Sequence, residues 1–60
     1  MFTVIKIVSD GQTWYERVRT GEAANYAAQI GDLDAKVTAI AFGLNGEDSL
    51  RRVRELRASL

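Results

Sequence analysis

Two strand-like segments open the chain and are joined by a turn signal. Residues 2–8 (FTVIKIV) are rich in β-branched side chains and almost continuously apolar, which is typical of a central strand with a neighbour on each side. Residues 12–19 (QTWYERVR) contain two aromatic side chains and a valine, and predict a second strand. Asp10 and Gly11 lie between them and favour a tight turn, because both residue types tolerate positive φ. We therefore expect a β-hairpin over residues 2–19.

A short helix and a third strand are predicted next. Helical spacing puts four apolar side chains on one face, namely Ala23, Tyr26, Ala27 and Ile30. Thr20 is the expected N-cap. Glu22 follows in the first turn, where the helix dipole favours a negative charge. Gly31 is expected to end the helix, with Leu33 supplying the apolar contact that follows such an end. After a loop through residues 32–34, residues 36–42 (KVTAIAF) predict a strand that ends before Gly43.

The last segment predicts an amphipathic helix that runs to the C-terminus. Asn45 is the expected N-cap, and Glu47 and Asp48 follow in the first turn, where the helix dipole favours acidic side chains. At 100° per residue, four apolar side chains fall within an arc of about 120° and form one stripe. These are Leu50, Val53, Leu56 and Leu60.

The elements predict one α+β domain over residues 1–60 with the order ββαβα. The connection between the second and third strands contains a helix and is long enough for a crossover that makes these strands parallel. We expect a three-stranded mixed sheet of order 2-1-3, because this order puts the most apolar strand in the centre.

The hairpin, helix and strand over residues 1–42 resemble the opening of the β-grasp (ubiquitin-like) architecture. The resemblance concerns the order of elements and no motif, and a helix stands where the last two strands of that fold would be. Fold likeness of this kind does not identify a function.

Hairpin register predicts an apolar sheet face that needs a cover. A two-residue turn pairs Ile7 with Trp14, Ile5 with Glu16 and Thr3 with Val18, and leaves Phe2, Val4, Val8 and Tyr15 on the opposite face. If both helices pack on the Ile5 side, this opposite face is open and marks an interaction site. The expected interface residues are Phe2, Val4, Tyr15, Arg17 and Val37. The alternative has one helix on each face.

Self-association is the simplest way to cover such a face, since two-fold dimers are the commonest closed assembly. The sequence therefore predicts a small non-enzymatic protein-interaction or regulatory module, expected to be a homodimer through the sheet face or edge. A structural subunit of a larger assembly would use the same face.

Arginines in the last helix raise a second possibility, a nucleic-acid-associated accessory protein. The residues concerned are Arg51, Arg52, Arg54 and Arg57, whose guanidinium groups suit phosphate. The opposing interpretation is a solvated face in which Glu47 pairs with Arg51 and Asp48 pairs with Arg52 at i, i+4 spacing. A formal net charge of zero favours the second interpretation.

The amino-acid composition excludes several kinds of catalytic and metal site. The 60 residues contain no Cys and no His, which removes disulfides, thiolate chemistry and the commonest general base and metal ligand. Asp32 and Asp34 are close in sequence but lack further oxygen donors for a metal, so we expect no metal, no cofactor and no catalysis. No apolar run approaches the roughly 18 residues that a bilayer span needs, and the N-terminal segment lacks the basic region and cleavage site of a leader, so we expect no membrane association and a cytoplasmic location. Arg outnumbers Lys six to two, a bias typical of high-GC bacterial or phage genomes.

Overall fold

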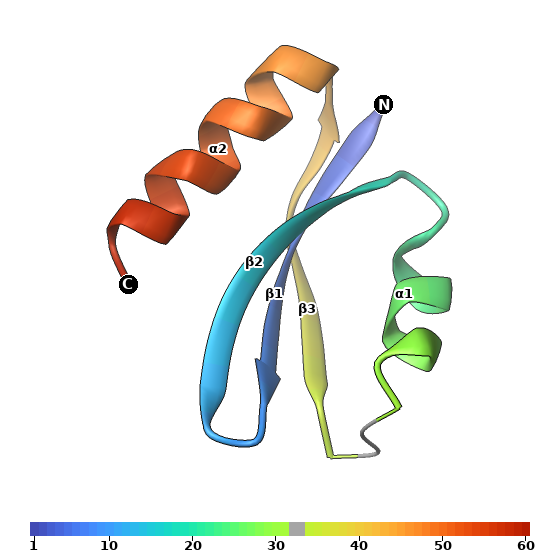
Figure 1. Cartoon of the computed structure of the whole chain (residues 1–60). Coiled ribbons are helices and arrows are strands. Elements are labelled where there is room, and N and C mark those ends of the chain that lie inside the picture. The colour runs from blue at the N-terminus through green and yellow to red at the C-terminus, as the bar shows by residue number, and fades with distance from the viewer. Residues whose placement is uncertain (32–33) are drawn as a thin grey trace.

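A computed structural model describes residues 1–31 and 34–60 of the chain. Its elements follow in the order β1 (Phe2–Ser9), β2 (Gln12–Arg19), α1 (Ala23–Gln29), β3 (Lys36–Leu44) and α2 (Gly46–Ala58) (Figure 1). The third strand continues two residues beyond its predicted end and passes through Gly43. The contact predicted for Leu33 and the metal candidate Asp32 lie outside the described residues.

The hairpin has the predicted register. Ile7 is paired with Trp14, Ile5 with Glu16 and Thr3 with Val18. Asp10 has φ 51° and Gly11 has φ 75°, which is the backbone conformation that a two-residue turn of this type requires. Two faces of the sheet follow from this register. We call them the Ile5 face, which carries Thr3, Ile5, Ile7, Trp14, Glu16 and Val18, and the Val4 face, which carries Phe2, Val4, Lys6, Val8, Tyr15, Arg17 and Arg19.

The sheet order is β2-β1-β3, as predicted, but the sheet is antiparallel and not mixed. Strand β3 does run in the same direction as β2, because the connection through α1 returns the chain to the end where β2 starts. Since β1 lies between these two strands, each is hydrogen-bonded only to an antiparallel neighbour. The expectation of a mixed sheet was wrong because the two parallel strands, β2 and β3, are not neighbours in the sheet.

Irregular pairing changes which residues of β3 lie against β1. Ile5 is paired with Ala39, but the next paired residues are Val4 with Ala41 and Phe2 with Leu44, so β3 carries two extra residues relative to β1. In a regular ladder Ile40 and Phe42 would have occupied these two positions. The bulges replace them with Ala41 and Leu44 on the Val4 face. As a consequence Ile40 and Phe42 are exposed, by 40% and 70%.

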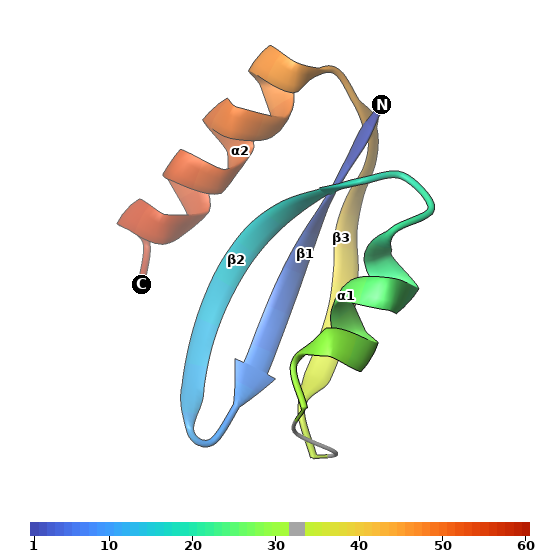
Figure 2. The same cartoon turned by 45° about the vertical axis from the view of Figure 1, so that its right-hand side comes forward.

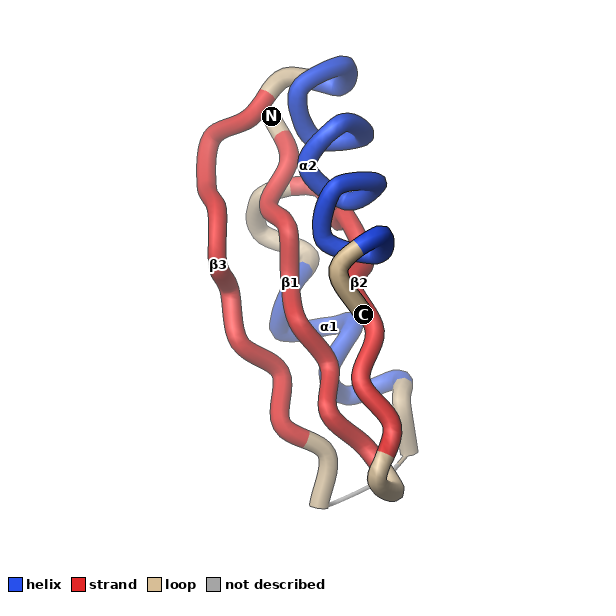
Figure 3. Tube along the Cα trace, turned by 90° about the vertical axis from the view of Figure 1, so that its left-hand side faces the viewer, coloured by secondary structure: helices blue, strands red, loops and turns tan. Residues whose placement is uncertain are grey.

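The two helices lie on opposite sides of the sheet, which is the alternative that the sequence left open. In Figure 3 α2 lies in front of the strands and α1 behind them, and in Figures 1 and 2 the strands again separate the helices. Helix α2 covers the Val4 face, since Gly46 lies against Phe2 and Arg17 of that face. The central strand is thus covered on both sides, and Val4 and Ile5, which point in opposite directions, are both fully buried. Because β1 carries apolar side chains on both faces, one helix on each face buries more apolar surface than two helices on the same face.

The ends of the two helices agree only in part with the caps predicted from the sequence. Gly31 has φ 76° directly after the C-cap Ile30, as expected. Thr20 is not the N-cap of α1; Glu22 holds that position, and the Thr20 hydroxyl lies 3.3 Å from the Thr3 hydroxyl. Asn45 caps α2 through Oδ1, which accepts a hydrogen bond from the Asp48 amide at 2.7 Å.

The core is small and centres on β1. The described apolar residues that are buried are Val4, Ile5, Ile7 and Val53, together with the polar side chains of Thr3 and Ser49. Of the predicted α2 stripe, only Val53 is buried, whereas Leu50 and Leu60 are exposed. The molecule is correspondingly thin, with extents of 31 × 26 × 13 Å.

Candidate protein-interaction surface

The two edges of the sheet differ in whether another part of the chain contacts them. At the β2 edge Arg57 of α2 donates a hydrogen bond to the Tyr15 carbonyl at 3.0 Å and pairs with Glu16 at 3.5 Å. This guanidinium occupies a backbone acceptor that another strand would use. At the β3 edge no further strand is paired within the described residues, and Figure 3 shows no helix beyond β3. Strand β3 therefore presents nine residues with one open side.

Exposed apolar side chains occur at the start of the chain and from the middle of β3 onward. Met1 and Phe42 are 72% and 70% exposed, and Ile40 is 40% exposed. The Met1 side chain lies against Gly43, with its Cε 3.7 Å from the position that a Cβ on that glycine would occupy. We refer to Met1, Ile40 and Phe42 as the β3 corner. Sequence reasoning assigned Ile40 and Phe42 to a regular strand; the signal that was available is Gly43, since a glycine within a strand pattern is typical of a bulge.

Opposite charges lie at the two ends of β3. Lys36, the first residue of the strand, is paired with Val8 and therefore lies on the Val4 face. Glu47 and Asp48 follow the other end of the strand, in the first turn of α2, the helix that covers this same face. Asp48 is paired with Arg51, whereas Lys36 and Glu47 have no ion-pair partner in the described part of the chain.

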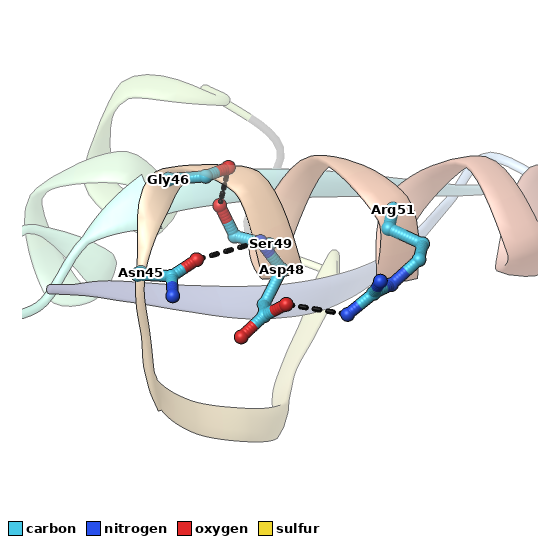
Figure 4. A network of polar contacts seen from close by, with 5 residues as sticks. All are labelled: Asn45, Gly46, Asp48, Ser49 and Arg51. Atoms are coloured by element: carbon cyan, nitrogen blue, oxygen red, sulfur yellow. Dashed lines mark hydrogen bonds and ion pairs between the residues drawn. The ribbon is translucent and has the colours of Figure 1, made fainter.

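Helix α2 is attached to the sheet at its N-terminus through Arg17. The Nη1 of Arg17 donates to the Gly46 carbonyl at 3.1 Å and lies 3.3 Å from the Ser49 hydroxyl, to which it also donates. The guanidinium lies over the Phe2 ring, 4.5 Å from its centroid. Ser49 is fully buried and its hydroxyl donates to the Gly46 carbonyl at 2.8 Å, beside the Asn45 cap (Figure 4). These contacts fix the position of Glu47 relative to the end of β3.

The residues predicted to form an open sheet face are mostly engaged within the chain. Val4 is fully buried, so its side chain has no surface left for a partner. Phe2 and Arg17 are half-buried under the start of α2, and Tyr15 and Val37 are half-buried on opposite faces. The structure therefore does not bring these five together into one exposed patch, because α2 covers the face that was expected to be open.

Among the described residues, Arg51 and Arg57 of α2 have partners within the chain. Arg51 pairs with Asp48 at i, i+3 spacing, in place of the predicted pairing with Glu47 (Figure 4). Arg57 is held at the β2 edge by Tyr15 and Glu16. Arg52 and Arg54 are exposed on the same helix.

Metal-binding clusters and pockets are absent from residues 1–31 and 34–60. There the acidic side chains form no group of three or more that could hold a metal ion, and no pocket is found. The helices in this part of the chain are too short or too polar to span a bilayer. The exposed apolar and charged residues around β3 are the feature that remains to be explained.

In comparisons with known proteins, no family model, no characterised sequence and no solved structure gives a significant match to this chain. The resemblance to the β-grasp opening therefore rests on the order of elements alone. What the chain does has to be inferred from its own surface.

Proposed function

We propose that this chain is a non-enzymatic protein-interaction module that self-associates along β3. The observation that carries the proposal is the open edge of β3 with the apolar β3 corner at its end. Exposed edge strands with apolar side chains associate readily with other strands, and soluble proteins usually protect them with charges, bulges or covering elements. Here the β2 edge has such a cover in Arg57 and the β3 edge has bulges but no covering element in the described residues.

The small number of buried apolar side chains and the large exposed area of the chain support self-association. Apolar residue types make up 47% of the sequence, yet four apolar side chains are buried among the described residues. A compact monomer of 6.6 kDa is expected to expose about 3,900 Å². The chain exposes 4261 Å², which is more than that estimate. Small domains with cores of this size commonly gain stability from oligomerisation, and cysteine-based crosslinks are unavailable to a chain without Cys.

Sedimentation equilibrium from about 10 µM to about 1 mM protein tests the proposal. We expect the wild type to self-associate and Phe42→Asp to be a monomer over this range, because the charge would lie in the contact between copies. Leu60→Asp is the matched control, since Leu60 is 67% exposed and lies at the end of α2, away from β3. Equal association of wild type and Phe42→Asp, or a monomeric wild type, would contradict the proposal.

Nucleic-acid binding through the arginines of α2 is the alternative that the sequence raised. With Arg51 and Arg57 paired inside the chain, Arg52 and Arg54 would have to carry it. Two exposed cations on a chain of zero net charge form a weak electrostatic attraction for phosphate, so the β3 edge is the better supported proposal.

A further inference from the structure

We infer that two copies of this chain lie antiparallel along β3 about a two-fold axis near Ile40, and that Lys36 of each copy pairs with Glu47 of the other. This inference rests on the proposed function and adds the geometry and polarity of the contact. It identifies the occupant of the open edge as a second copy of the same chain. Three features of β3 support it: the placement of its end charges, their common face, and the apolar residues between them.

The two charges are placed for a symmetric contact. Lys36 lies four residues before Ile40, which corresponds to about 13 Å along a regular strand. Leu44 lies four residues after Ile40, but the bulges of β3 shorten this second span. A two-fold axis near Ile40 therefore sets Lys36 of one copy at or just beyond Leu44 of the other. Glu47 follows Leu44 by three residues, within the first turn of α2, so the acidic turn follows directly on the end of β3 at which Lys36 of the other copy lies.

The faces match as well as the distances. Lys36 and Leu44 both lie on the Val4 face, because they are paired with Val8 and Phe2 respectively. Helix α2 covers this same face. A two-fold axis perpendicular to the sheet reverses strand direction and keeps each face on its own side. Lys36 and the acidic turn of the other copy therefore meet on one side of a continuous sheet.

The opposite orientation of the two copies is disfavoured by the same charges. A parallel arrangement would set both Lys36 residues at one end of the contact and both acidic turns at the other, with no pair of unlike charge, whereas the antiparallel one forms two such pairs. The zero net charge of the chain adds no general repulsion between copies. Between the charged ends, Ile40 and Phe42 supply the apolar contact, and their exposure is a result of the bulges in β3.

Charge reversal in trans tests this geometry. Lys36→Glu and Glu47→Lys each replace two attractive contacts per dimer by two repulsive ones, so each variant alone should have a dissociation constant raised roughly tenfold, measured by sedimentation equilibrium. A mixture of the two variants forms a heterodimer in which both contacts are attractive again. We expect the mixture to associate with the affinity of the wild type, and each variant's effect to shrink in high salt.

Rescue by mixing separates an intermolecular role from a structural one, because damage within a chain cannot be repaired by a second chain. Arg54→Glu is the control with the same change in charge, at an exposed position in the second half of α2, and should leave the dissociation constant unchanged. Equal affinities for the wild type and both single variants, or a weakened mixture, would overturn the antiparallel charge pairing while leaving association through Phe42 intact. A monomeric wild type would overturn the proposed function as well.

Discussion

The guanidinium of Arg17 lies 4.5 Å from the centroid of the Phe2 ring, on the face of the sheet that α2 covers. The same side chain donates hydrogen bonds to Gly46 and Ser49, at the start of α2. Phe2 belongs to β1 and Arg17 to β2, so one arginine joins both strands of the hairpin to the last helix. Because α2 carries Glu47, this contact also determines where the acidic turn stands beside the end of β3.

Replacement of Arg17 by Ala should therefore destabilise the fold more than its position on a surface strand suggests. The variant loses a cation–π contact and leaves the buried Ser49 hydroxyl without its Arg17 donor, and we expect a loss of about 2 kcal/mol in the free energy of unfolding. Urea unfolding followed by circular dichroism gives this value. Arg19→Ala is the matched control on the same strand, since Arg19 is exposed, and should change stability by less than about 0.5 kcal/mol. Equal effects of the two substitutions would show that Arg17 does not hold α2.

The Asn45 cap gives a second, separable test of the start of α2. Asn45→Ala removes the acceptor for the Asp48 amide, which should cost about 1 kcal/mol of stability in urea unfolding. Asn45→Asp keeps an acceptor at this position and should restore most of the loss. Asn25→Ala is the control, because Asn25 makes only an exposed side-chain contact with Glu22 in α1. A full loss in Asn45→Asp would indicate that the amide group acts by some means other than capping.

Local sequence patterns predicted the hairpin best, because its register depends on two turn residues and on side chains a few positions away. The bulges of β3 depend on contacts that the local pattern does not contain. Val4 and Phe2 lie under α2, and the positions facing them are taken by Ala41 and Leu44 in place of Ile40 and Phe42. The regular alternation of residues 36–42 therefore concealed the two apolar residues that became exposed.

The side of α2 that faces the sheet could also not be predicted from the local sequence pattern. The stripe of leucines predicted its buried face by spacing, but the sheet makes its closest approach around Ser49 and Val53, which are both buried. Arg17 holds the first turn of α2 at Gly46 and Ser49, whereas the next residue, Leu50, is exposed. A contact between a charged side chain of β2 and the start of α2 is not contained in the apolar spacing of the helix.

Glycines at the two ends of the β3–α2 connection should respond in opposite directions to substitution. Gly43 has φ 67°, so Gly43→Ala forces a side chain into the left-handed region and should cost about 1–2 kcal/mol. Gly46 has no such restriction, and a Cβ there would meet Phe2 and Arg17 at an ordinary 3.7 Å. Gly46→Ala should therefore be neutral or stabilising by about 0.5 kcal/mol. Thermal unfolding of both variants measures the contrast, and a stabilising Gly43→Ala would mean that the bulge does not persist in solution.

Substitutions along α2 test which side of the helix contacts the sheet. Val53 is 4% exposed, so Val53→Ala should leave a cavity in a core with few other members and cost about 2 kcal/mol. Leu50→Ala removes a larger side chain, yet Leu50 is exposed and the expected loss is below about 1 kcal/mol. The comparison is made at low micromolar concentration by urea unfolding, where association through β3 contributes least. A larger loss for Leu50→Ala than for Val53→Ala would mean that the side of α2 with Leu50, and not the side with Ser49 and Val53, packs against the sheet. Because α2 would then be turned about its axis, the Glu47 side chain would also point in a different direction relative to β3.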